Sequence, residues 1–450
     1  MKFFLLLVIV FFKANLVSAS SSNSIDICSR GLIGDLIASK MDTRCDKVDP
    51  TKLGKITTLS LEDKLLFRIP ANAFRGLHSL KSLDLSQNEI NSVHSTAFNG
   101  LEHLESLNLR ENLINAVPTN AFSKLKNLKS LDLRNNRIQR LTSKAFKGMK
   151  FLKILSLRGN GIITISPNTF IGISSLEELD LESNELKHIA TNAFKGLPKL
   201  SDLSLKSNRI THLSSKAFQG LYALNRIDFS YNQLAQIPDQ LFSELSNLGW
   251  LNFYRNELTV VSLIAFKKLH SLIGLDLDTN KISTVPANAF IDLHSLKYLS
   301  IGANELTDVS IDAFQGLTSL IHLTIDTNKL TEIPSEAISC LTTLKKLDLR
   351  SNQFTSIPMN AFQGLASLGT LQLDHNKIST ISTGVFQELK NLRTLELKRN
   401  LITTFPEGSF LGLEALGWID LQQNPIKEIS TSAVGIDPSK VRVLGVTLVP

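Results

Sequence analysis

Carboxylates that recur at a fixed interval are the residues of this chain whose type and spacing most directly suggest catalytic chemistry. Aspartate recurs at multiples of 24 residues, each time between two apolar residues, as in Leu83-Asp84-Leu85. Paired carboxylates can serve as general acid and general base. A long row of equivalent carboxylates on one strand face is more typical of a solvated surface, and we favour that interpretation. The row comprises Asp84, Asp132, Asp180, Asp228, Asp276, Asp348 and Asp420.

Other catalytic or metal-binding signatures are missing from the sequence. It has no Gly-x-Ser-x-Gly elbow, no Walker loop, no His-Glu-x-x-His motif and no second cysteine pair at zinc spacing. Of the nine histidines, only His322 and His375 fall at outward-facing strand positions, and neither has a partnered nucleophile. We therefore expect a protein that is not an enzyme and that holds no cofactor and no metal.

Composition places the chain among ordinary globular proteins. It has 450 residues, of which 43% are hydrophobic and 20% charged, which excludes a disordered chain, collagen and a polytopic membrane protein. The net charge is +7. A mildly basic surface suits an anionic partner without naming one, and we expect no nucleic-acid partner.

The first residues resemble an export signal. Lys2 precedes an unbroken apolar run from Phe3 to Phe12, and Val17-Ser18-Ala19 offers small residues for cleavage after Ala19. The run is about half as long as a bilayer span requires, and no later segment approaches that length. We therefore predict a signal peptide at 1–19 and a secreted, extracellular protein without a transmembrane anchor.

An internal repeat determines the fold prediction. Asparagine recurs every 24 residues from Asn88 to Asn424 without insertion, and Lys64 stands one step earlier in a matching phrase. Sixteen units of 24 residues therefore cover 56–439. The apolar-polar-apolar triplet before each asparagine has period two, which predicts a short strand with both apolar residues on one side.

Two further positions that are equivalent in every repeat, here called columns, indicate the conformation of the segment that leads from one predicted strand back to the next. Phenylalanine stands ten residues after the asparagine position, which Lys64 occupies in the first unit, in fourteen of the units, as at Phe98. Seven prolines share the column six residues after it, beginning with Pro70. Because proline lacks an N–H and restricts φ, this stretch is predicted to be extended or turn-like rather than helical.

The unit Leu-x-x-Leu-x-Leu-x-x-Asn-x-Ile-x-x-Ile-Pro-x-x-Ala-Phe-x-Gly-Leu resembles the typical 24-residue class of extracellular leucine-rich repeats. Arrays of this kind occur in Slit-like proteins, chondroadherin-like matrix proteins and Toll ectodomains. The resemblance implies an α/β repeat solenoid, curved like a horseshoe. It also implies a concave parallel sheet, a convex side of loops and short helices, and a ladder of asparagines bonding the backbone between turns.

The two ends depart from that family. Its usual N-terminal cap has four cysteines, whereas this chain has Cys28 and Cys45 there, and we expect these two to pair within a cap at 20–55. At the other end Asn424-Pro425-Ile426 begins the usual C-terminal phrase but no cysteine follows. We expect 440–450 to form an edge segment that includes a final strand.

Aromatic residues gather on the predicted concave face. Both tryptophans and three of the four tyrosines occupy outward-facing strand positions, and all of them except Trp418 lie on neighbouring turns. Exposed aromatics with arginine are the composition of binding hot spots, although bulky side chains could merely fill the concave curvature. The predicted partner-binding residues are Tyr231, Trp250, Tyr254, Arg255, Tyr298 and His322.

A second predicted site on that face is basic. Stacked arginines in consecutive turns repel one another, so a bound anion could relieve them, although an ordinary solvated face is the simpler interpretation. Farther along, Asp278, Asp326 and Asp374 reverse the sign of the same column, so the face is predicted to be bipolar. The predicted anion-binding residues are Arg110, Arg134, Arg158, Lys129 and Lys153.

These features favour a secreted, non-enzymatic recognition or adhesion protein that binds an extracellular macromolecule on its concave face. The alternatives are a matrix protein holding sulfated glycans on its basic patch and an innate-immune recognition protein resembling Toll ectodomains. No Asn-x-Ser/Thr sequon occurs, so we expect no N-linked glycan. Cys340 is the odd cysteine, and we favour an unpaired thiol over a homodimer linked through it.

Overall fold

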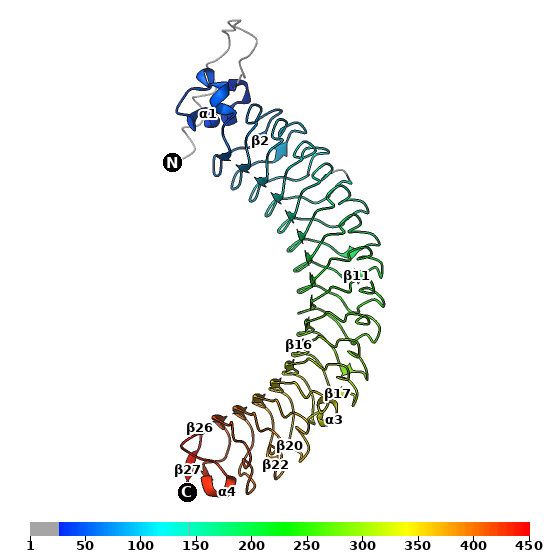
Figure 1. Cartoon of the computed structure of the whole chain (residues 1–450), viewed down its shortest axis with the longest axis vertical. Coiled ribbons are helices and arrows are strands. Elements are labelled where there is room, and N and C mark those ends of the chain that lie inside the picture. Colours follow the sequence, from blue (N-terminus) through cyan, green and yellow to red (C-terminus); the bar gives the residue numbers. More distant parts are fainter. Residues whose placement is uncertain (1–26, 144) are drawn as a thin grey trace, which may run out of the picture.

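The computed structural model describes residues 27–143 and 145–450, so the predicted signal peptide lies outside the described residues. The chain winds into a crescent of stacked coils, with the N-terminal cap at one tip and the C-terminal segment at the other (Figure 1). This architecture confirms the predicted leucine-rich-repeat solenoid. Its helices are short: Cys28–Arg30 (η1), Leu32–Ser39 (α1), Cys45–Lys47 (η2), Pro50–Leu53 (α2), Ser335–Ile338 (α3) and Thr431–Val434 (α4).

One 17-stranded parallel sheet lines the concave side, and its strands follow chain order. Each strand is three residues long and lies 24 residues after its neighbour, in register, so that Leu83 pairs with Leu107. The strands are Thr58–Ser60 (β1), Ser82–Asp84 (β3), Ser106–Asn108 (β5), Ser130–Asp132 (β6), Ile154–Ser156 (β7), Glu178–Asp180 (β8), Asp202–Ser204 (β10), Arg226–Asp228 (β12), Trp250–Asn252 (β13), Gly274–Asp276 (β14), Tyr298–Ser300 (β16), His322–Thr324 (β18), Lys346–Asp348 (β19), Thr370–Gln372 (β21), Thr394–Glu396 (β23), Trp418–Asp420 (β24) and Arg442–Leu444 (β26).

Alternation along each strand separates the core from the concave surface. The apolar residue at the strand centre, such as Leu131, is buried, while its two neighbours face outward. A second set of short strands, paired two by two in five separate sheets, lies along the flank that follows the main strands, because the chain there is extended. It consists of Arg68–Ile69 (β2), Ser92–Val93 (β4), His188–Ile189 (β9), His212–Leu213 (β11), Thr284–Val285 (β15), Asp308–Val309 (β17), Ser356–Ile357 (β20), Thr380–Ile381 (β22), Glu428–Ser430 (β25) and Thr447–Val449 (β27).

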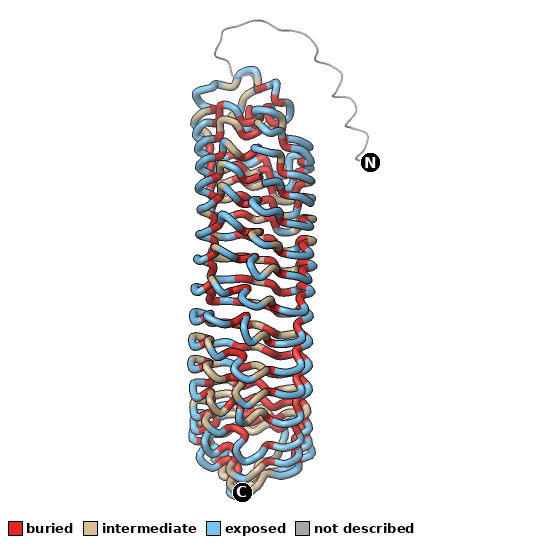
Figure 2. Tube along the Cα trace, turned by 90° about the vertical axis from the view of Figure 1, so that its right-hand side faces the viewer, coloured by how far each residue is buried: buried red, intermediate tan, exposed pale blue. Residues whose placement is uncertain are grey.

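Phenylalanines form a buried spine beneath the convex loops. Phe74, Phe98 and Phe122 stack with centroids 5.9 Å and 5.7 Å apart, and most later turns continue the spine. Strands in a sheet lie only about 4.8 Å apart, so coils are spaced more widely at the spine than at the sheet, which favours the observed curvature. Buried and exposed residues alternate within every coil seen from the convex side (Figure 2).

The asparagine ladder implied by the family resemblance is present from Asn88 to Asn424. In one rung the side-chain oxygen of Asn256 accepts from the Leu234 N–H at 3.1 Å. Its amide donates to the carbonyls of Phe229 and Phe253 at 3.0 Å and 3.1 Å. Each asparagine thus satisfies buried backbone groups in its own turn and in the preceding one, which no strand pairs.

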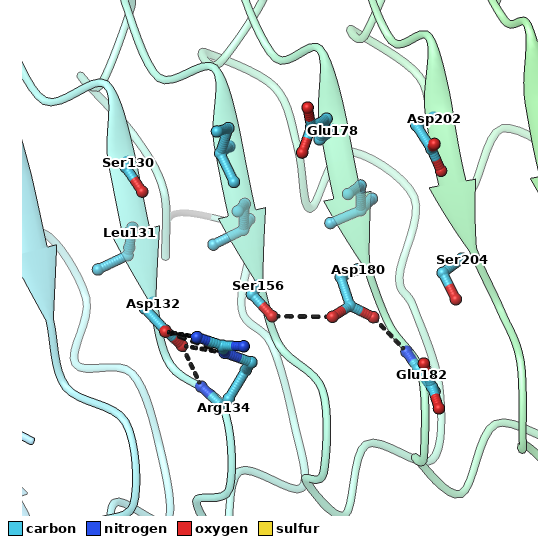
Figure 3. A pocket seen from close by; sticks show the side chains of 13 residues that line it. Ser130, Leu131, Asp132, Arg134, Ser156, Glu178, Asp180, Glu182, Asp202 and Ser204 are labelled. Carbon is cyan, nitrogen blue, oxygen red and sulfur yellow. Dashed lines mark hydrogen bonds and ion pairs between the residues drawn. The ribbon is translucent and has the colours of Figure 1, made fainter.

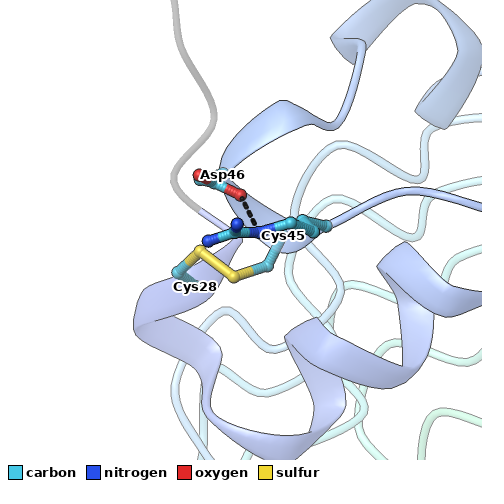
Figure 4. The surroundings of a disulfide bond; sticks show 4 residues. Cys28, Cys45 and Asp46 are labelled. Atoms are coloured by element: carbon cyan, nitrogen blue, oxygen red, sulfur yellow. Dashed lines mark ion pairs between the residues drawn. A yellow bond between two sulfur atoms is a disulfide. The ribbon is translucent and has the colours of Figure 1, made fainter. Parts of the chain in front are cut away.

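The N-terminal cap is held by the predicted disulfide, which the structure confirms between Cys28 and Cys45 (Figure 4). Helix α1 buries Ile33 and Ile37 against the start of the core. At the other end, β26 pairs with β24 at the usual 24-residue interval, and β27 pairs with β25. Over the described part of the chain, no helix is long and apolar enough to cross a membrane.

Candidate partner-binding surface

The concave sheet presents three outward columns: the first and third residues of each strand, and the residue that lies two positions after each strand. The structure places the six predicted partner-binding residues on this side of the solenoid, but it divides them between two clusters. One cluster lies at the amino ends of strands β13, β16 and β18. The other lies in the loops that follow β12 and β13.

The first cluster is a row of rings across four turns. Trp250 stacks on Tyr298 with centroids 5.9 Å apart, and Tyr298 meets His322 edge-on at 5.1 Å. Trp250 and Tyr298 are not on adjacent strands, because β14 lies between them and contributes Gly274 at this position. A Cβ at Gly274 would come within 2.3 Å of the Trp250 ring. The missing side chain is therefore what allows the tryptophan to lie across β14.

These rings wall a groove of about 510 Å³ on the concave sheet. Asp276 is one of its lining residues, and burial raises the pKa of this carboxyl to about 6. Burial, together with nearby Lys346, lowers the pKa of His322. We call this site the aromatic groove; its lining is Arg226, Ile227, Trp250, Leu251, Asn252, Gly274, Leu275, Asp276, Tyr298, Leu299, Ser300, His322 and Thr324.

The second cluster surrounds Tyr231. Tyr254 meets this ring edge-on at 5.3 Å, and the guanidinium of Arg255 and the ammonium of Lys206 lie 5.3 Å and 5.7 Å from its centroid. Cations at these distances are attracted by the ring face. Trp250 begins β13, whereas Tyr254 lies two residues beyond its end, so the two clusters lie at opposite ends of the strands.

The predicted anion-binding residues are all engaged with carboxylates. Their partners are close in every case, so the repulsion that motivated the prediction is already offset within the protein. The pairs are Arg110 with Glu111, Arg134 with Asp132 at 2.5 Å, Arg158 with Glu182 at 3.2 Å, Lys129 with Glu105 at 2.6 Å and Lys153 with Glu177 at 2.8 Å.

Acidic side chains also line the concave sheet in this region (Figure 3). A depression of about 440 Å³ spans β6 to β10 and contains Asp132, Glu178, Asp180, Glu182 and Asp202. Burial raises the pKa of Asp202, although Arg226 acts in the opposite direction. The N-terminal part of the concave face therefore carries charges of both signs, whereas the sequence predicted a basic segment there. The difference arises because acidic side chains of neighbouring columns lie against the arginines.

The predicted acidic segment begins beside the aromatic groove, because Asp278 lies on the same turn as Gly274 and Asp276. Asp278 accepts hydrogen bonds from the Ser300 hydroxyl at 2.6 Å and the Gly302 N–H at 2.5 Å. Burial, together with the neighbouring Glu396, raises the pKa of Asp374 to about 7. Within the described residues, no group of three or more histidine, cysteine or acidic side chains could hold a metal ion.

Gly274, Asp276 and Arg226 were not among the predicted residues of this surface. A signal for Gly274 was nevertheless available. It is the only glycine at the first position of the seventeen strands, and it falls between Trp250 and Tyr298. Arg226 and Asp276 had no such signal, because charged residues are common in their columns.

Tandem leucine-rich repeats arranged in this way form a class of solenoids that generally serve in recognition of proteins and peptides. A family profile described as leucine rich repeat matches this chain in overlapping segments from 54 to 426. The chain therefore belongs to the leucine-rich repeat family, as the motif predicted. No curated protein matches the sequence.

Solved structures agree with this assignment. A leucine-rich-repeat protein of Leptospira interrogans is 25% identical, with a TM-score of 0.63 over 88% of this chain and 97% of that one. Toll of Drosophila, in complex with Spatzle, is 20% identical with a TM-score of 0.67, over 87% of this chain and 54% of Toll. A plant peptide hormone receptor in complex with RGF2 is 23% identical with a TM-score of 0.57, over 87% and 67%. The last two likenesses establish the fold alone.

Proposed function

We propose that this chain is a secreted, non-enzymatic recognition protein that binds an extracellular protein through its concave sheet, with the aromatic groove as the anchor. The observation that carries the proposal is the stack of Trp250 on Tyr298 across Gly274. Large rings held in place before binding lose little conformational freedom when a partner arrives, which is typical of hot spots.

Exposure supports a role in binding rather than in filling the curvature. Trp250 and Tyr298 remain 43% and 39% exposed in the folded chain, so much of each ring is available to a partner. The Tyr231 cluster lies within the reach of a standard protein interface, which buries about 800 Å² on each partner. A single partner could therefore cover both clusters at once.

Secretion is supported by the disulfide of the N-terminal cap, because disulfides persist in oxidising compartments. The apolar segment at 3–12 provides the second argument. Within this proposal, an adhesion role and an innate-immune role differ only in the identity of the protein that is bound.

Affinity capture tests the proposal. The mature chain is used as bait in extracellular fluid from its source, bound proteins are identified by mass spectrometry, and the binding of each candidate is then measured with purified protein. Trp250→Ala should weaken a true concave partner by more than about 2 kcal/mol, or roughly thirtyfold.

Trp418→Ala is the matched control for this experiment. Trp418 occupies the same column on β24 but lies outside the aromatic groove, where Arg442 packs over its ring at 5.3 Å. A captured protein that loses no affinity with Trp250→Ala, or loses equally with both variants, would overturn the proposed site.

A further inference from the structure

Positive charge is concentrated in a short part of the chain. Residues 110–158 contain twelve lysines and arginines but only two carboxylates, Glu111 and Asp132. The resulting local charge exceeds the +7 of the whole chain. The net positive charge of the protein is therefore concentrated in two turns of the solenoid.

Part of this charge has no acidic partner. Four lysines in these turns are exposed and form no ion pair with any described residue, in contrast to the five basic residues described above. They lie in the convex turns and on the flank that leads into β6 and β7. These lysines are Lys124, Lys126, Lys147 and Lys150.

The 24-residue period places Lys126 beside Lys150 and Lys129 beside Lys153. The Lys153 N–H donates to the Lys129 carbonyl at 2.8 Å, so equivalent residues of the two turns are neighbours. Lys126 and Lys150 form one such row, and Lys129 and Lys153 form the next. We call the combined surface the lysine flank; it consists of Lys124, Lys126, Lys129, Lys147, Lys150 and Lys153.

A shallow depression adjoins these rows. It measures about 340 Å³, and its lining includes Lys81, Lys129, Lys153, the ring of Phe151 and the carboxylate of Glu105, which pairs with Lys129. Phe151 is 57% exposed. The exposed ring of Phe151 offers a surface for the C–H face of a sugar. Lys126 and Lys150, next in sequence to the lining residues Asn127 and Phe151, supply unpaired ammonium groups for its charged substituents.

We propose that the lysine flank binds a sulfated polysaccharide. Lys126 and Lys150, which stand on adjacent turns without a carboxylate partner among the described residues, repel one another and attract a linear polyanion that neutralises several lysines at once. Binding of such a chain would release counterions and depend steeply on salt.

The surroundings favour a polysaccharide over other polyanions. Single-stranded nucleic acid requires a series of aromatic platforms, whereas the residues equivalent to Phe151 in the adjacent turns are Asn127 and Ser175. The Cys28–Cys45 disulfide favours an oxidising, extracellular compartment, where sulfated polysaccharides occur. The lysine flank is also separate from the aromatic groove, so this inference does not depend on the proposed protein partner.

Heparin is the probe for the experiment, with the full secreted chain as the protein. Lys126→Gln combined with Lys150→Gln should weaken binding at physiological salt by about tenfold and reduce the slope of log K against log salt by about two. The matched control is Arg137→Gln combined with Arg140→Gln. These arginines are exposed residues of the same turns, without ion pairs among the described residues, but they follow the strands and lie on the opposite flank.

The control should change the heparin affinity by less than about threefold, since it removes the same net charge from the wrong flank. Equal losses in both variants would attribute binding to net charge alone and overturn the site. Unchanged binding in the lysine variant would do the same. Circular dichroism of each variant verifies that the solenoid is intact.

Single-stranded RNA and vesicles containing phosphatidylserine are tested on the same variants. Tighter binding of either probe than of heparin, lost with Lys126→Gln and Lys150→Gln, would overturn the choice of a polysaccharide. Trp250→Ala should leave heparin binding unchanged, so failure of the concave protein site and failure of the lysine flank are distinguishable.

Discussion

Trp250 and Tyr298 stack at 5.9 Å although a whole strand separates them, because Gly274 on that strand has no side chain. Two residues 48 positions apart in the chain thus form one wall of the aromatic groove through the absence of a third side chain. The arrangement requires the strict 24-residue period, which places all three residues at the first position of their strands.

Gly274→Ala should displace the Trp250 ring from Tyr298, since the new Cβ would meet the ring at 2.3 Å. We expect a red-shifted tryptophan emission and a loss of partner affinity, with little change in unfolding. Fluorescence in a Trp418→Phe background isolates the signal of Trp250. Gly369→Ala is the control, because a Cβ there would have its nearest contact at 3.6 Å. Identical spectra for Gly274→Ala and the parent would contradict this account of the groove.

The 24-residue period of the sequence predicts part of this arrangement. The period was sufficient for the fold, because every coil repeats the same pairing of leucines, asparagine and phenylalanine. It also located the outward columns that contain Trp250 and Tyr231. It could not show that these residues belong to separate clusters, because side-chain direction within a column is decided by rotamers and neighbours.

The charged columns illustrate the same limit. Lys129 and Arg134 were predicted as parts of an anion site, but Glu105 and Asp132 reach them in the folded chain. Ion pairing between columns depends on side-chain length and on the turn of the solenoid, neither of which is visible in a repeat alignment. A count of net charge over residues 110–158 would have indicated the lysine flank from the sequence.

Asp276→Asn should stabilise the protein at pH 7.5 by about 2 kcal/mol and have little effect at pH 4. Burial raises the folded-state pKa of Asp276 to about 6, above an unfolded value of about 4. The folded state therefore binds the proton more tightly, and the ionised carboxylate lowers stability increasingly as the pH rises from about 4 through about 6. Asparagine keeps the oxygen that accepts from the Asp278 N–H at 3.0 Å.

Urea unfolding at both pH values measures this effect. Asp420→Asn is the control for loss of a carboxylate as such, because Asp420 holds the equivalent bond from the Gln422 N–H at 2.9 Å, far from the groove. A destabilising effect of Asp276→Asn at pH 7.5 would show that the buried carboxylate contributes to stability instead of opposing it.

Asn256→Ala should destabilise the solenoid by about 3 kcal/mol or more. Its side chain satisfies the Leu234 N–H and the carbonyls of Phe229 and Phe253, and each buried group left without a partner costs about 1–3 kcal/mol. The free energy of unfolding in urea measures the loss. The control is Asn225→Ala, an exposed asparagine on the flank whose amide donates to the Asn247 carbonyl at 3.0 Å. An equal loss of unfolding free energy in the two variants would contradict a special role of the buried asparagine ladder in stability.

Cys45→Ser should lower the stability of the N-terminal cap by about 2–4 kcal/mol, because the bond to Cys28 closes a short loop in the unfolded chain. Limited proteolysis should then cleave within 28–55 while the repeats stay protected, since the repeat core is shared among many turns. Arg44→Ala, which removes the exposed ion pair with Asp46 beside the disulfide, is the control and should not change the pattern. Cleavage spread equally along the chain would contradict a local role for the bond.

Cys340 should remain an unpaired, slowly reacting thiol, and the secreted protein should migrate as a monomer on non-reducing gels. The side chain is half-buried, and its sulfur donates to the Ala337 carbonyl at 3.5 Å. Burial raises the pKa of the Cys340 thiol, so the reactive thiolate is scarce at neutral pH. The rate of labelling with a thiol reagent, measured before and after unfolding in urea, tests this, and we expect a large increase on unfolding. A dimer that disappears with Cys340→Ser would reverse the prediction and establish the intermolecular disulfide instead.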